Sequence, residues 1–338
     1  MYIQNNIELK KLNTFGLPST AAFFTEARSV KELSEIITSA DWEGVPKFIL
    51  GGGSNILLLN NVDQLVIHVL IKGIEKTQES DEHIWLHVGG GEMWHDLVMY
   101  CVSNNYAGVE NLSLIPGTVG AAPMQNIGAY GVEIKDVVES VEAISLATGD
   151  VRIFNWEECN FGYRESVFKN TLKGQYVITG VTLRLSKFPV FRVAYGDIRS
   201  TLDGMGVTSY SIKAISEAVT RIRRSKLPDP AEIGNAGSFF KNPEMSKERY
   251  EALKVLFPSM PGYNTEPNTV KVPAGWLIEQ ANWKGFRDGA VGVHDKQALV
   301  LVNYGDGTGE QIKQLSEKIQ DSVEAKFGIR LAAEVNFV

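Results

Sequence analysis

Apolar residues in the first half of the chain follow two different spacings, and these predict short helices and strands in mixed order. Within residues 28–39 and 93–103, apolar side chains recur every three or four positions, as on one face of an amphipathic helix. Alternating or continuous apolar runs predict strands at 48–50, 64–70, 83–88, 137–146, 151–154 and 177–185. Because helices and strands do not alternate regularly, we expect an α+β region rather than a doubly wound sheet.

The pattern changes near Lys187. Residues 188–203 have the composition of a linker, and residues 211–224 have the apolar spacing of a helix. Pro228 lies just beyond that helix and is expected to stop it.

A second α/β segment follows and extends to the end of the chain. Its last helix is predicted at 310–327, with Gly328 as the cap. Residues 329–337 alternate apolar and polar side chains, which predicts a final strand with Glu334 on its polar face.

The composition narrows the class of protein. With 338 residues, 44% hydrophobic and 22% charged, the chain suits a folded protein of two or three domains. A net charge of -7 argues against general nucleic-acid binding, which needs Lys and Arg to neutralise phosphates. We find no signal peptide, no apolar run long enough for a membrane helix, and too few cysteines for a disulfide framework. We therefore expect a soluble cytoplasmic protein with no membrane or nucleic-acid partner.

Two glycine-rich segments are candidate ligand loops. The first glycine loop, Gly-Gly-Gly-Ser-Asn at residues 51–55, follows a predicted strand, and glycines let successive N–H groups turn toward a phosphate. The second glycine loop, residues 116–131, is built almost entirely of small residues, amides and hydroxyls, which suits close approach to a flat ring or a pyrophosphate. Neither matches the dinucleotide fingerprint or the Walker A pattern. The residues alone indicate a nucleotide-type ligand, and a plain tight turn stays an alternative for the first loop.

Six segments, in order along nearly the whole chain, resemble the UDP-N-acetylenolpyruvoylglucosamine reductase family. They are the two glycine loops, Phe-Gly-Tyr-Arg at 161–164, Ala-Tyr-Gly-Asp at 194–197, Gly-Asn-Ala-Gly-Ser-Phe-Phe-Lys-Asn-Pro at 234–243 and Ala-Gly-Trp-Leu-Ile at 274–278. Departures from the family pattern are small, such as Glu165 after the arginine and Met124 in the second glycine loop.

The resemblance implies an α+β fold in three parts. Residues 1–187 would form a PCMH or vanillyl-alcohol-oxidase-type FAD-binding region of two subdomains, and residues 188–228 a tyrosine loop with its connecting helix, as in the longer subclass of the family. Residues 229–338 would form an α/β substrate-binding domain whose last strand returns to the active site.

The resemblance also implies an activity. The chain would be an oxidoreductase that acts on a CH–CH bond, with non-covalent FAD as cofactor and NADPH as electron donor. Its substrate would be UDP-N-acetylglucosamine enolpyruvate, and its product, UDP-N-acetylmuramic acid, would enter peptidoglycan synthesis. We expect a monomer that requires no metal.

The family's site residues carry over by position. The catalytic residues would be Arg164, Ser238 and Glu334. The cofactor contacts would be Gly51, Gly52, Gly53, Ser54, Asn55, Ile115, Pro116, Gly117, Thr118, Gly120, Ala121, Ala122, Gln125, Asn126, Gly128 and Ala129. The substrate contacts would be Tyr130, Tyr195, Lys226, Asn242, Tyr263, Lys271 and Gln297.

The three catalytic residues suit the reduction of a vinyl ether conjugated to a carboxylate. The Arg164 guanidinium can bind the carboxylate in a bidentate fork, Ser238 can donate a proton to the α-carbon, and a protonated Glu334 can donate a hydrogen bond to the developing enolate. Each also has a simpler interpretation: a surface arginine, a turn or N-cap serine, and an exposed strand residue.

The basic run at Arg221, Arg223 and Arg224 is usually surface charge, but it could bind the phosphates of the nucleotide sugar or of NADPH. His83 and His87 lie four positions apart on a predicted strand, about 13 Å from each other, which does not suit a shared metal.

Two other functions remain open on sequence grounds. The first is an FAD oxidase with the same cofactor fold, although neither glycine loop contains the His or Cys that often tethers the flavin in such enzymes. The second is a nucleotide-sugar binding protein without catalysis.

Overall fold

The computed structural model describes residues 2–338, which form two compact units. The first unit comprises residues 2–7, 21–52 and 63–225, and the second comprises residues 8–20, 53–62 and 226–338. The chain therefore passes from one unit to the other several times, and the first glycine loop itself contains one of these passages.

The strands of the first half are β1 (Gln4–Glu8), β2 (Thr20–Ala27), β3 (Lys47–Leu50), β4 (Ile56–Leu57), β5 (Val62–Val69), β6 (Ile74–Glu79), β7 (His83–Gly89), β8 (Gly128–Ala129), β9 (Val132–Glu133), β10 (Val138–Ser145), β11 (Val151–Asn155) and β12 (Tyr176–Ser186). Those of the second half are β13 (Gly234–Ser238), β14 (Glu244–Ser246), β15 (Tyr263–Glu266), β16 (Thr269–Lys271), β17 (Arg287–Asp288), β18 (Val291–Val293), β19 (Val300–Asn303) and β20 (Asn336–Phe337). The helices are α1 (Val30–Ile37), α2 (Trp94–Ser103), α3 (Ile198–Gly204), α4 (Ile212–Lys226), α5 (Lys247–Leu256), α6 (Ala274–Gln280) and α7 (Gly309–Phe327).

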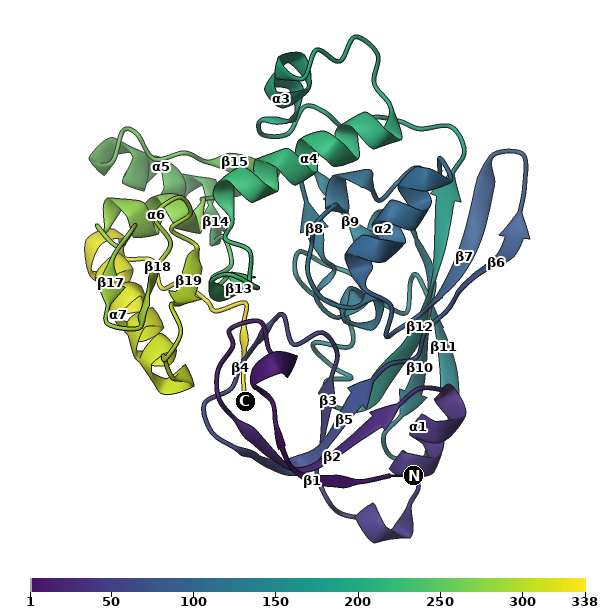
Figure 1. Cartoon of the computed structure of the whole chain (residues 1–338). Helices are drawn as coiled ribbons and strands as arrows, with labels where there is room; N and C mark the ends of the chain where they lie inside the picture. The colour runs from purple at the N-terminus through teal and green to yellow at the C-terminus, as the bar shows by residue number, and fades with distance from the viewer. Residues whose placement is uncertain (1) are drawn as a thin grey trace. The chain divides into compact units, whose positions relative to one another are not determined.

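The first unit is built on two sheets. A four-stranded sheet has the order β1-β2-β5-β3, and a five-stranded sheet has the order β11-β10-β12-β7-β6, with the β6–β7 hairpin at its edge (Figure 1). Strand β12 lies at the centre of the larger sheet, antiparallel to both β10 and β7. The helix α2 packs on this sheet through Trp94, Leu97 and Cys101, which are fully buried. All the helices and strands predicted for residues 28–185 are present, with ends shifted by no more than two residues.

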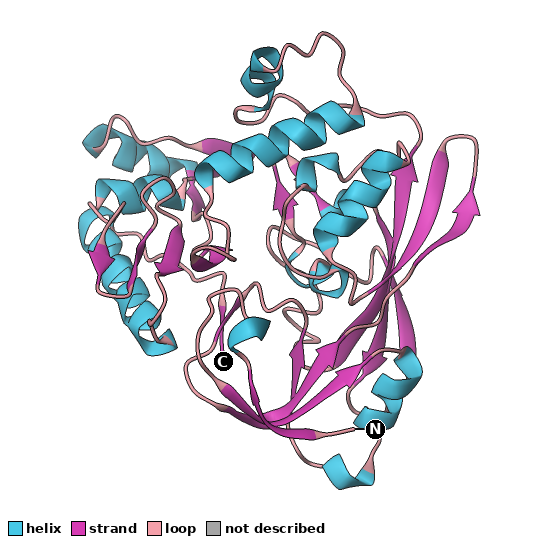
Figure 2. Cartoon of the chain, in the orientation of Figure 1, coloured by secondary structure: helices cyan, strands magenta, loops and turns pink. Residues whose placement is uncertain are grey.

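The second unit combines helices with short strands (Figure 2). Its sheets have the orders β13-β19-β18-β17 and β14-β16-β15, and β20 pairs in parallel with β4. The helix α7 starts with a capping box formed by Thr308 and Gln311 and ends at Gly328, whose φ of 66° is the left-handed cap expected from the sequence.

Two predicted elements are wrong. The segment 188–203 is not a linker throughout, because α3 begins at Ile198, whose side chain is buried with Leu202 against α4. The predicted final strand at 329–337 is reduced to β20. Its alternation reflects burial of Ile329, Leu331 and Val335 in the core of the second unit rather than a continuous ladder.

Among residues 2–338, no helix is long and apolar enough to cross a membrane.

Candidate active site

The two glycine loops meet in the first unit. Gly51 and Gly52 directly follow β3, and a Cβ placed on Gly52 would lie 2.9 Å from the Cα of Gly117. A Cβ on Gly51 would lie 2.7 Å from Oγ1 of Thr118. Neither Gly51 nor Gly52 has a positive φ, so this close approach, and not backbone conformation, requires glycine there. The loops thus form one continuous backbone surface, as a ligand that touches both would need.

The second glycine loop is held from behind by the larger sheet. The N–H of Gly120 donates to the carbonyl of Gly90 at 2.8 Å, and a Cβ on Gly120 would lie 3.0 Å from the carbonyl oxygens of Gly90 and Ile178. Asn126 is fully buried, and its amide bonds to Glu133 at 3.0 Å and to the carbonyl of Gly162 at 2.9 Å. Its side chain therefore supports the loop from within.

Arg164 is anchored on the same loop. Its guanidinium donates to the carbonyls of Gly128 at 2.7 Å and Asn126 at 3.4 Å, and its backbone has a φ of 56°. The side chain is half-buried. Arg164 is therefore not a mobile surface arginine, because its hydrogen bonds to the loop fix the position of its charge.

Two further residues, His95 and Arg223, form hydrogen bonds with Leu114, just before the second glycine loop. Leu114 has a φ of 59°; its N–H donates to Nδ1 of His95 at 3.0 Å, and its carbonyl accepts from Nε of Arg223 at 3.2 Å. Burial, together with Arg224 and Arg223 nearby, lowers the pKa of His95 despite Asp96, so Nδ1 stays an acceptor.

Of the basic run on α4, only Arg223 turns inward. Burial lowers the pKa of Arg223 from its ordinary value, although a guanidinium stays charged in proteins. Arg221 and Arg224 are exposed. The sequence pattern gave no means of separating the three.

The tyrosine loop is joined to the second glycine loop by one buried amide. Nδ2 of Asn111 donates to the carbonyl of Tyr130 at 3.1 Å and to that of Arg192 at 2.9 Å. Farther along, Tyr195 lies over Gly131, where an added Cβ would be 3.4 Å from the Tyr195 Cβ. The structure thus brings together Tyr130 and Tyr195, which were both expected to contact substrate, and Asn111 is a further residue that sequence reasoning missed.

In the second unit, three predicted site residues come together. The N–H of Glu334 donates to the carbonyl of Phe239 at 2.8 Å, next to Ser238, and Nδ2 of Asn55 donates to the carbonyl of Glu334 at 3.2 Å. Ser238 is exposed at the end of β13 and follows Gly237, beside which there is open space. Ser238 caps no helix, and Glu334 is half-buried rather than on an exposed strand.

The remaining expected substrate contacts divide into supported and exposed groups. The Oδ1 atom of Asn242 accepts from the N–H of Ala274 at 2.9 Å, which caps α6, and Oε1 of Gln297 accepts from the N–H of Leu299 at 3.4 Å. Tyr263 and Lys271 are directly opposite each other on β15 and β16, and Lys271 lies 3.4 Å from Glu244. Lys226 is exposed at the last residue of α4.

No cluster of three or more His, Cys, Asp or Glu side chains suited to a metal occurs within the described residues 2–338.

Comparison with known proteins identifies two family models that match the chain. Residues 21–155 match the model of an FAD binding domain, and residues 229–338 match the model of the UDP-N-acetylenolpyruvoylglucosamine reductase C-terminal domain. Proteins named UDP-N-acetylenolpyruvoylglucosamine reductase from Amoebophilus asiaticus and Flavobacterium johnsoniae are 52% and 50% identical to the chain, each over 100% of both sequences.

A solved structure supports the fold. The crystal structure of UDP-N-acetylenolpyruvylglucosamine reductase from Thermus caldophilus aligns with a TM-score of 0.69 at 22% identity, covering 99% of each chain. The expected α+β architecture, with an FAD-binding domain followed by the C-terminal domain of the reductase family, is thereby confirmed.

The chain is identical to these two relatives at half or more of its positions and matches them from end to end. Both family regions occur in the expected order. The chain therefore belongs to the UDP-N-acetylenolpyruvoylglucosamine reductase family.

Proposed function

We propose that this protein uses NADPH to reduce the enolpyruvyl ether of UDP-N-acetylglucosamine, giving UDP-N-acetylmuramate for peptidoglycan synthesis. Membership of the family supports the substrate and the use of FAD. The structural observation that carries the proposal is the position of Arg164: a guanidinium bonded to the carbonyls of Gly128 and Asn126, within the loop that would hold the cofactor.

The residues present fit FAD. Gly52 packs directly against the backbone of Gly117, and neither residue carries a side chain that could keep a ligand from the main chain, which suits a pyrophosphate and the edge of a flat ring. Asn55 and Gln125 are polar groups within these loops. When bound, FAD supplies the hydride that the reduction needs.

The protein's own groups would supply charge and protons. Arg164 would bind the substrate carboxylate and offset the negative charge that develops on it during reduction. Ser238 would donate its hydroxyl proton to the α-carbon, and Glu334 would donate a hydrogen bond to the enolate in its protonated form. Support for the serine comes from its exposure beside Gly237, where open space leaves room for a substrate.

The nucleotide sugar would be bound by the residues that the family resemblance assigns to substrate contact: Tyr130, Tyr195, Lys226, Tyr263, Lys271, Asn242 and Gln297. Tyr195 is 58% exposed, so most of its ring is available to a ligand. The preference for NADPH over NADH comes from the family alone. The cytoplasmic location and the monomeric state expected from the sequence stay predictions.

The decisive experiment separates the two half-reactions. Under air-free conditions, NADPH should bleach the yellow protein, and UDP-N-acetylglucosamine enolpyruvate should restore its colour. Ser238→Ala should still be bleached at the normal rate but lose about a hundredfold or more in the rate of reoxidation by substrate, since general acid catalysis contributes on that scale.

Ser259→Ala, a change of the same kind at an exposed serine of the second unit, is the matched control and should behave as wild type in both halves. Equal loss in both halves would remove the proton-donor role from Ser238. Reoxidation by oxygen but not by the enolpyruvyl substrate would favour an oxidase, and a colourless protein that binds the nucleotide sugar would leave only a binding function.

A further inference from the structure

A cavity of about 210 Å³ lies in the first unit, and its lining includes Val132, just after the second glycine loop, and Asn111, which bonds to Tyr130 of that loop. It is walled by the start of β7, the end of β12, the segment 107–111 and the chain that leads from β12 toward the tyrosine loop. None of its lining residues is among the expected cofactor, catalytic or substrate contacts. Pockets for drug-sized ligands are usually about 300–1,000 Å³, so this one suits a smaller molecule than FAD or a nucleotide sugar.

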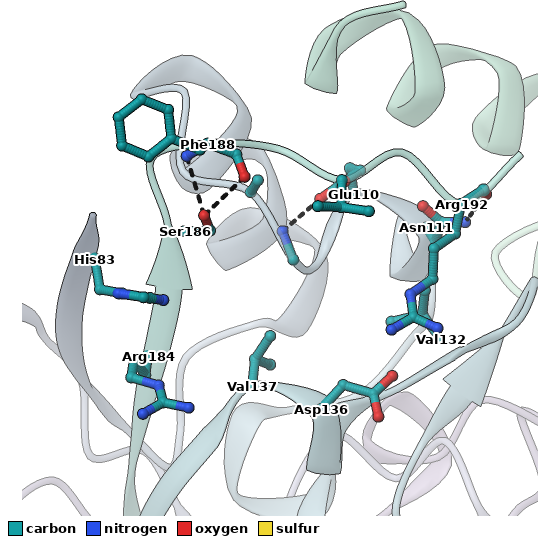
Figure 3. Close-up of a pocket in the computed structure, with 13 residues that line it drawn as sticks. His83, Glu110, Asn111, Val132, Asp136, Val137, Arg184, Ser186, Phe188 and Arg192 are labelled. Carbon is teal, nitrogen blue, oxygen red and sulfur yellow. Dashed lines mark hydrogen bonds between the residues drawn. The ribbon is translucent and has the colours of Figure 1, made fainter.

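Two arginine side chains lie on opposite sides of this cavity, with the His83 imidazole beside one of them. Figure 3 shows His83 and Arg184 on one side and Arg192 on the other, above Asp136. Nε of Arg184 approaches a carboxylate only at 3.9 Å, to Glu139, and the Arg192 guanidinium has neither an ion pair nor a hydrogen bond with any part of the chain from residue 2 to residue 338.

The two carboxylates of the cavity are already bonded to backbone. Glu110 is 4% exposed and accepts from the N–H of Gly108 at 2.7 Å, and Asp136 accepts from the N–H of Glu133 at 3.2 Å. The side chains of the cavity therefore have more hydrogen-bond donors than the protein uses. A ligand with acceptor oxygens would satisfy them, and the Arg192 guanidinium, which has no ion pair within residues 2–338, is the group to which a negatively charged ligand would bind.

The same cavity has an exposed apolar wall. Phe188 is 66% exposed and Val190 is 84% exposed, and both line it beside the guanidinium groups. A single exposed apolar residue needs no explanation, but two on the wall of a donor-rich cavity indicate a ligand with an apolar part. We propose that this pocket binds a small organic anion, a phosphate monoester or a carboxylate, between Arg184 and Arg192, with its apolar part on Phe188 and Val190.

Such a ligand would tie the tyrosine loop to the larger sheet. Arg184 belongs to β12, whereas Arg192 lies on the segment that runs into the tyrosine loop, and the Arg192 carbonyl is already bonded to Asn111. An anion held in the cavity against the Arg192 guanidinium would restrict that segment and thereby limit the movement of Tyr195. This effect on catalysis rests on the proposed function of Tyr195, whereas binding of the anion does not.

The test is calorimetric titration of the FAD-loaded protein with phenyl phosphate, in the presence of saturating UDP to occupy any nucleotide-sugar site. Wild type should bind one equivalent. Arg184→Gln and Arg192→Gln should each weaken binding by about tenfold or more, because each removes a charged hydrogen-bonding partner. Arg152→Gln is the matched control: Arg152 is an exposed arginine of the same unit, paired with Glu158 outside the cavity, and its loss should leave binding unchanged.

Two further probes examine the two halves of the ligand. Inorganic phosphate should bind more weakly than phenyl phosphate, and phenol should not bind measurably. The proposal is overturned if wild type fails to bind phenyl phosphate, if UDP abolishes binding, or if the two pocket variants bind as well as Arg152→Gln. Retained binding without any change in the KM for the nucleotide sugar would overturn only the coupling to the tyrosine loop.

Discussion

Substitution of Gly52 by alanine tests whether the contact between the two glycine loops holds the cofactor. The new Cβ would lie 2.9 Å from the Cα and 3.3 Å from the carbonyl carbon of Gly117, and both obstacles are backbone that cannot rotate away. The loops must then separate by several tenths of an ångström or more. Such overpacking costs about 1–3 kcal/mol. If the cost falls on the FAD-bound arrangement, FAD affinity should drop by about 5- to 150-fold.

The assay is the FAD dissociation constant, from flavin fluorescence quenching on titration into the apoprotein, with thermal unfolding of the apoprotein measured in parallel. Gly51→Ala should be milder, because its obstacle is the side-chain oxygen of Thr118, which can rotate. Gly204→Ala is the control: Gly204 ends α3 without a positive φ, and a Cβ there meets nothing within 4 Å. If Gly52→Ala binds FAD as tightly as Gly204→Ala, the loop contact does not shape the cofactor site.

Two other changes address the residues that hold the second glycine loop and the tyrosine loop. The folded pKa of His95 is lowered, so its contribution to stability is present above its unfolded value of 6.5 and is lost as pH falls below it. His95→Asn keeps an acceptor for Leu114 but cannot titrate, so between pH 7.5 and 5.5 its unfolding free energy should fall less than that of wild type; an identical pH profile would contradict this. Asn111→Leu removes two buried hydrogen bonds, to Tyr130 and Arg192, worth about 1–3 kcal/mol together. It should raise the KM for the nucleotide sugar by about tenfold while bleaching by NADPH is unchanged, and a loss confined to bleaching would refute the role of Asn111 in the tyrosine loop.

Long periodic segments were predictable from sequence because burial enforces their period. On α4, Ile215, Val219 and Ile222 are all buried, as their spacing requires. The segment 329–337 failed under the same logic: its apolar residues are buried, but its backbone bonds to 239–241 at only two points, Glu334 to Phe239 and Lys241 to Ala332. Alternation reports which side chains are buried, and it does not report whether a neighbouring strand exists.

Of the candidate site, composition could identify the glycine loops but not what holds them. A loop of small residues is recognisable because few other roles suit it. The residues that support it, such as His95 and Asn111, are ordinary polar residues bonded to carbonyls, and hydrogen bonds to backbone require no particular spacing in the sequence. His95 lies 19 residues from its partner Leu114, and Asn111 lies 81 residues from Arg192.

Two arginines hold the second glycine loop and the residue just before it, and only one of them could be identified from the sequence. Arg164 donates to Gly128 at one end of the loop, and Arg223 donates to Leu114 just before the other end. Arg164 belongs to a short motif that resembles the family, so it was expected. Arg223 stands in a run of basic residues on a helix, but it lies seven positions after Ser216, on the same helical face, and Ser216 bonds to Ser113 at 2.8 Å. The face of α4 that carries Ser216 and Arg223 thus contacts two consecutive residues, Ser113 and Leu114. Which arginine of the run points inward therefore depends on what its helix face packs against, and not on the charge of its neighbours in the sequence.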